Sequence, residues 1–186
     1  MSLDATLASL RRELAGLRDV MSALHVTVIE DRPARQSVVL VDQLDNIITD
    51  MFSALEEADA LAAHALQGAQ PNGPLEQVQA GLRGIHALVN RFTATYIGQL
   101  ASHDHLAQLL EMGDERGRGW WEWSQEVKRA IERCAAPMSG VAGAMVACWS
   151  ELAERLARNS VSVQATNIGQ QITLREDQME LTGKVT

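Results

Sequence analysis

The fold is decided first by residues 3–28, which read LDATLASLRRELAGLRDVMSALHVTV. Apolar side chains recur in this stretch at alternating intervals of four and three residues, which is the seven-residue repeat of a coiled-coil seam. The residues on this seam are Leu3, Leu7, Leu10, Leu14, Leu17, Met21, Leu24 and Val28. The pattern predicts one amphipathic helix over residues 1–31, which ends where Arg32 precedes Pro33.

The seam has two interpretations. In the first, two copies of the chain pair through it, with Glu13 and Arg18 at the flanking positions that can bridge two parallel helices. The residues that would carry this self-association are Leu7, Leu10, Leu14, Leu17, Met21 and Leu24. In the second, the same stripe packs on the chain's own bundle, because the two kinds of stripe differ little over such a length.

Two further segments show the same periodicity. Residues from about 35–38 to 67 carry a broad apolar face, which is typical of a helix that contacts more than one neighbour. Gly68 and the run from Pro71 to Pro74 indicate a turn, and another helix is expected to begin after Pro74.

The last part of the chain is less regular. A helical region opens at Trp120 and continues to Leu156, with a kink or break expected at Pro137. From Asn159 onward, β-branched residues alternate with polar ones, so residues 159–186 are expected to be an extended or disordered tail. The sequence as a whole predicts an all-α protein: an antiparallel helical bundle over 34–158, with a coiled-coil-like N-terminal helix and this tail.

Composition narrows the classes of function. The chain has 186 residues and a formal net charge of −8, and an acidic balance argues against nucleic-acid binding. No apolar stretch is long enough to span a bilayer, so a membrane protein is not expected. Two cysteines and the lack of a visible secretory signal favour a cytoplasmic protein, and the composition, rich in Ala and Arg and poor in Lys, suggests a bacterial one.

Acidic residues gather on the second predicted helix. No Lys or Arg occurs between Arg35 and Arg83, and nothing nearby in the sequence offsets the negative charge. The acidic residues that lie off the seam are Asp42, Asp45, Asp50, Glu56, Glu57 and Asp59. They form either a docking surface for a partner with a basic surface or a solvated face that keeps the protein soluble.

Trp120, Trp121 and Trp123 lie too close together on one helix for all three rings to face the same core. At least one ring is therefore expected to be exposed or at an interface, where Trp is a frequent anchor. The alternative is an irregular start to the segment that turns all three rings inward.

Residues 136–149 are uncharged and contain small residues four apart, such as Gly140 with Ala144. Close packing within the bundle explains this pattern. The alternative is a membrane-acting, pore-forming type of protein that exposes this segment on activation, although the segment is short for a membrane span.

Few sequence features support a catalytic or metal-binding function. His103 and His105 are two residues apart and cannot share one face of a helix, and no Glu-x-x-His motif of a di-iron bundle occurs. No nucleophile elbow or phosphate-binding loop is present, so we expect no catalytic residue, no metal and no cofactor. The sequence therefore predicts a non-enzymatic interaction or scaffold protein, an adaptor or regulatory subunit, that binds other protein chains and forms homo-oligomers.

Overall fold

The computed structural model describes residues 2–31, 39–97 and 118–183, and all regular structure in these ranges is helical. The helices are α1 (Leu3–His25), α2 (Val39–Gly68), α3 (Leu75–Arg91), α6 (Arg118–Glu132) and α7 (Ala135–Gly183). Two π-helical segments, η1 (Val26–Glu30) and η2 (Phe92–Ile97), continue α1 and α3. The predicted all-α fold is confirmed.

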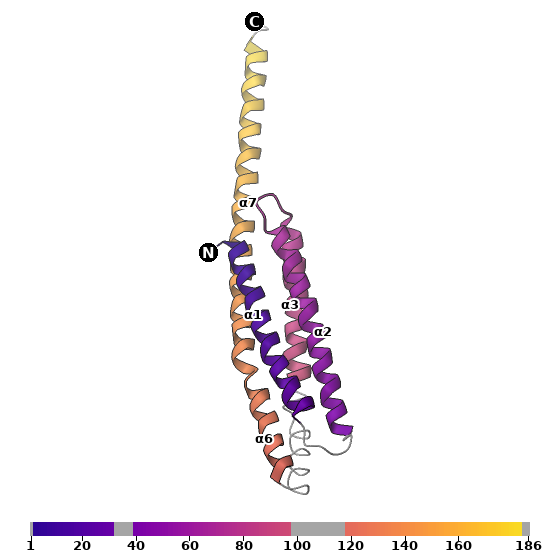
Figure 1. The fold of residues 1–186 in the computed structure, drawn as a ribbon. Coiled ribbons are helices and arrows are strands. Elements are labelled where there is room, and N and C mark those ends of the chain that lie inside the picture. Colours follow the sequence, from indigo (N-terminus) through magenta and orange to yellow (C-terminus); the bar gives the residue numbers. More distant parts are fainter. Residues whose placement is uncertain (1, 32–38, 98–117, 184–186) are drawn as a thin grey trace.

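The helices form an antiparallel bundle (Figure 1). Each of α1, α2, α3 and the rod formed by α6 and α7 runs opposite to its neighbours, and α1 packs against both α2 and α7. On the far side of the bundle, α3 packs against α2 and α7. The side chains between the helices form one hydrophobic core, which is the normal arrangement when each helix has one apolar stripe to bury.

The seam of α1 lies inside this core. Leu7, Leu10, Met21 and Leu24 have no exposed surface, and Leu14 and Leu17 are 2% exposed. Of the two interpretations of the repeat, the structure has the second: the stripe packs on the chain's own bundle. Residues 3–30 are therefore part of the bundle and not a separate arm.

The α2–α3 connection follows the predicted turn. α2 ends at Gly68, and α3 begins at Leu75 directly after Pro74. Arg155 of α7 donates hydrogen bonds to the carbonyls of Ala69, Gln70 and Pro71, so that α7 stabilises the end of this hairpin.

Near that end, α2 and α3 come close together because small residues line their interface. Gly81 of α3 faces Ala65 of α2, where an added Cβ would lie 2.9 Å from the Ala65 Cβ and 3.1 Å from the Leu61 carbonyl oxygen. A glycine at this position is therefore required by the close approach of the two helices.

The predicted break near Pro137 is present, slightly earlier in the chain. α6 ends at Glu132 and α7 begins at Ala135, which places Pro137 in the first turn of the new helix, where a missing N–H is tolerated.

The extended form of the predicted tail is not present in residues 159–183. The backbone from Asn159 to Gly183 continues α7 as one helix, and Figure 1 shows this helix running beyond the rest of the bundle. The β-type alternation of residues 161–165 misled the prediction, because short alternating runs are ambiguous between strand and helix.

Candidate protein-binding surfaces

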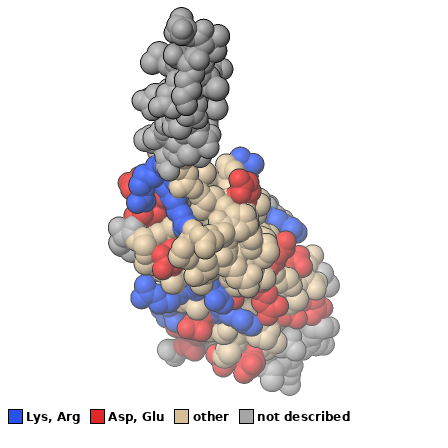
Figure 2. All heavy atoms as spheres, turned by 90° about the horizontal axis from the view of Figure 1, so that it is seen from above, with Lys and Arg blue, Asp and Glu red and all other residues tan. Residues whose placement is uncertain are grey.

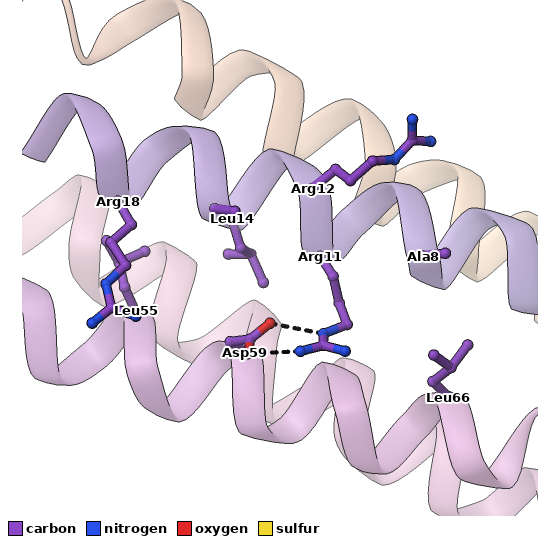
Figure 3. A pocket seen from close by; sticks show the side chains of 9 residues that line it. Ala8, Arg11, Arg12, Leu14, Arg18, Leu55, Asp59 and Leu66 are labelled. Carbon is purple, nitrogen blue, oxygen red and sulfur yellow. Dashed lines mark hydrogen bonds and ion pairs between the residues drawn. The ribbon is translucent and has the colours of Figure 1, made fainter.

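A surface groove of about 400 Å³ lies between α1 and α2 (Figure 3). Small side chains on α1 leave the space, apolar side chains form its floor, and arginines of α1 stand along it. The lining residues are Ala8, Arg11, Arg12, Leu14, Ala15, Arg18, Leu55, Asp59 and Leu66.

Two ion pairs connect α1 to α2 beside this groove. The Arg11 guanidinium donates two hydrogen bonds to the Asp59 carboxylate, at 2.8 and 2.9 Å, as the dashed lines in Figure 3 show. This contact lowers the pKa of Asp59 and raises that of Arg11. Arg18 donates to Glu56 at 2.9 Å, and His25 lies 3.4 Å from Asp45. The three contacts follow one another along α1 because Arg11, Arg18 and His25 are seven residues apart, about two helical turns, and so lie on the same side of the helix.

These pairs change the interpretation of the acidic residues on α2. Asp59 and Glu56 face the guanidinium groups of Arg11 and Arg18, and Asp45 lies beside the imidazole of His25, so residues distant in sequence offset part of the charge that nothing nearby in the sequence offsets. The compensating residues are distant in sequence and become neighbours only when α1 packs on α2.

Four of the six acidic residues are exposed, and three of these four have no cationic partner within the described residues. Asp42, Asp50 and Glu57 point to solvent, and within the described residues no cation pairs with them. Figure 2 shows acidic and basic side chains mixed on the face seen from above, so this face is not a single acidic surface. A negative docking surface on α2 is thus reduced to these three carboxylates.

The tryptophans divide between core and surface. Trp123 is 5% exposed and donates its indole N–H to the Thr27 carbonyl at 2.8 Å, whereas Trp121 is 49% exposed. The expectation that at least one ring is exposed is confirmed by Trp121. The side chain of Trp120 lies outside the described part.

The contact of Trp123 follows from the π-helix at the end of α1. In this segment the amide of Asp31 donates to the carbonyl of Val26, five residues back, instead of to Thr27. The Thr27 carbonyl therefore accepts the Trp123 N–H instead. No pattern in the sequence indicates this π-helix.

α7 has two different faces between Ala135 and Ser160. Val141, Met145, Cys148 and Leu152 are buried against the other helices. The opposite face is exposed over about five turns, and its residues are small or uncharged: Ser139, Gly143, Val146, Ser150, Ala153 and Ala157. The small residues of this segment therefore lie partly on the surface, where Gly143 has no atom within 4 Å of an added Cβ.

Few side chains in the described ranges could bind a metal or act as a nucleophile. Among the residues whose side chains the structure describes, no cluster of three metal-ligating groups occurs, and the His103 to His105 segment lies outside them. Cys134 and Cys148 are free thiols in the core, and burial raises the pKa of Cys134 to about 11. A thiol held in its neutral form is a poor nucleophile.

None of the described helices has an apolar stretch of the length needed to cross a membrane. In comparisons with known proteins, no family model, no curated protein and no solved structure matches the chain.

Proposed function

We propose that this protein is a non-enzymatic scaffold or adaptor, which works by binding other protein chains through helix packing. The observation that carries the proposal is the part of α7 beyond Ser160. Leu156, Asn159 and Ser160 still lie beside the loop that joins α2 to α3, and beyond them the helix continues to Gly183 away from the bundle.

A helix of this kind gains little stability by itself. At 1.5 Å per residue the segment 161–183 is about 35 Å long. It contains Val, Ile, Thr, Asn and Gly, which are weak helix formers, so helix propensity alone stabilises it little. Most helical stability in proteins comes from burying an apolar face, so the segment favours a partner that covers it.

Other exposed features support the same class of function. Trp121 offers a large ring of the type enriched at interfaces, and the free carboxylates of Asp42, Asp50 and Glu57 suit a partner with a basic surface. The two free buried thiols fit a reducing compartment such as the bacterial cytoplasm.

The test compares the full chain with a chain that ends at Ser160, each carrying the same affinity tag and expressed in the native host. All described core residues precede position 160, so the shortened chain is expected to keep its melting temperature. We expect the full chain to recover specific proteins, including untagged copies of itself or other chains, and the shortened chain to lose them. Recovery of nothing by the full chain, or of the same proteins by both chains, would contradict the proposal.

A further inference from the structure

The exposed face of α7 continues along the projecting part of the helix. Between Ser139 and Ala157 this face is small and uncharged, and the Ser150 hydroxyl donates to the Val146 carbonyl of its own helix at 3.1 Å. The face can therefore be covered without leaving that hydroxyl unpaired.

Beyond Ala157, the same side of the helix carries four larger apolar residues, one alanine and one arginine. α7 is uninterrupted from Ala135 to Gly183, so residues three or four apart stay on one face. The positions that follow Ala157 at such intervals are Val161, Ala165, Ile168, Ile172, Arg175 and Met179. No charged residue occurs between Asn159 and Leu174.

We propose that two copies of this chain pair antiparallel through this face, with the two-fold axis near position 159. The inference rests on the proposed function and names its partner. Each projecting segment then covers the exposed face of the other copy's bundle, so that Val161 lies against Ala157, Ala165 against Ala153 and Ile172 against Val146.

The spacing of the two halves is compatible with a second copy as the partner. Going outward from the axis, the projecting half steps by four, three, four, three and four residues from Val161 to Met179. The bundle half steps by the same intervals in the opposite direction, from Ala157 to Ser139. One face of a continuous helix steps by three or four residues in both directions, so an antiparallel pair of copies can keep this register along its whole length, with each residue pair occurring twice and the roles exchanged.

The sizes of the residues also match. In four of the six pairs a larger residue of the projecting half opposes a small one of the bundle half, as in Ile168 against Ser150 and Met179 against Ser139. Arg175 falls opposite Gly143, where open space would take the stem of the long side chain.

The bundles do not obstruct this pairing. The exposed face lies opposite the stripe that packs on the chain's own helices, so the second copy approaches α7 from its free side. The two bundles then lie toward opposite ends of the paired helices.

The first measurement is the mass of the purified full chain by size-exclusion chromatography with light scattering. We expect twice the chain mass of 20.3 kDa for the unaltered protein. Ala153→Asp would place a carboxylate twice in the interface and is expected to raise the dissociation constant at least about 100-fold. Ala80→Asp, at an exposed alanine of α3, is the matched control and is expected to stay dimeric.

The second measurement distinguishes the direction of pairing by mild oxidation of cysteine variants. Ala153→Cys and Ala165→Cys chains are mixed, and the antiparallel pairing predicts disulfide-linked dimers only in the mixture. Within either variant alone, equal positions would lie about 18 Å apart along the axis, from twelve residues at 1.5 Å each. A parallel pair would instead cross-link within each variant alone.

Each other outcome overturns the inference. These are a purified chain that is monomeric at all concentrations, cross-links within a single variant, or dimers that Ala80→Asp disrupts as much as Ala153→Asp. A monomer that still recovers another protein in the affinity experiment would remove the self-pairing alone. Failure of both experiments would remove the proposed function as well.

Discussion

Asp59 of α2 forms an ion pair with Arg11 of α1. Its carboxylate accepts two hydrogen bonds from Arg11, and both side chains are more than a third exposed. Exposed pairs of this kind contribute about 1 kcal/mol or less to the free energy of unfolding, because solvent screens them. We therefore expect Asp59→Asn to lower stability at pH 7 by up to about 1 kcal/mol in urea titration, while Asp50→Asn, at an acid without such a pair among the described residues, changes it by less.

The pH dependence of this effect has a definite sign. Folding lowers the pKa of Asp59 below its usual 3.8, so the folded state favours the charged form. The stabilisation is complete above pH 3.8 and is lost as the pH falls through the folded pKa. The difference in unfolding free energy between the unaltered chain and Asp59→Asn should thus shrink between pH 4 and pH 2, and a constant difference would show that Arg11 does not stabilise the charge.

Trp123 offers a second test at the residue scale. Trp123→Phe keeps the apolar ring but leaves the Thr27 carbonyl without the indole donor, which should cost about 1–2 kcal/mol. Trp121→Phe changes a ring that is 49% exposed and should stay within about 0.5 kcal/mol. Thermal unfolding followed by circular dichroism measures both, and equal effects would mean that this hydrogen bond has no part in stability.

At the scale of the elements, the close contact between α2 and α3 limits side-chain size most clearly. Gly81→Ala would bring a methyl group to 2.9 Å from the Ala65 Cβ and is expected to destabilise the bundle by about 1–3 kcal/mol. Gly16→Ala, on α1 with open space around it, should instead stabilise by about 0.5–1 kcal/mol through helix propensity. Denaturant titration of both variants decides the point, and stabilisation by both would show that α2 and α3 are less closely packed.

At this scale the sequence predicted what depends on local patterns. The repeat of residues 3–28, the turn before Leu75 and the break near Pro137 are local signals, and the structure has all three elements. The pairing of α2 acids with Arg11 and Arg18 depends on which helices become neighbours, which periodicity alone cannot determine. The helical tail was missed because the alternation of a few residues outweighed the continuity with α7.

For the molecule as a whole, α1 is the element that joins the neighbouring helices. Its seam residue Leu10 is fully buried between them, so Leu10→Ala should cost about 2–5 kcal/mol. Because α1 shares one core with α2, α3 and α7, we expect the loss to appear as a single lowered transition of the entire bundle. A separate early transition of α1 in circular dichroism would show instead that it is an independent arm.

The surfaces were less predictable than the core. The sequence identified the apolar residues of α1 but could not decide whether a second chain or the same chain covers them, because both arrangements bury the same stripe. The outward face of α7 was not recognised as a surface, since small residues carry little periodic signal until the buried side of the helix is known.

The single rod of α7 has a mechanical consequence. The first half of α7 packs in the bundle, and the second half projects from it without a break in the helix. A tilt of 5° at the held end would displace a tip about 35 Å away by roughly 3 Å, from the rise of 1.5 Å per residue. Small rearrangements of the bundle would therefore produce larger displacements at the C-terminal end of α7. A force applied at that end would act on the helices that pack against the first half of α7.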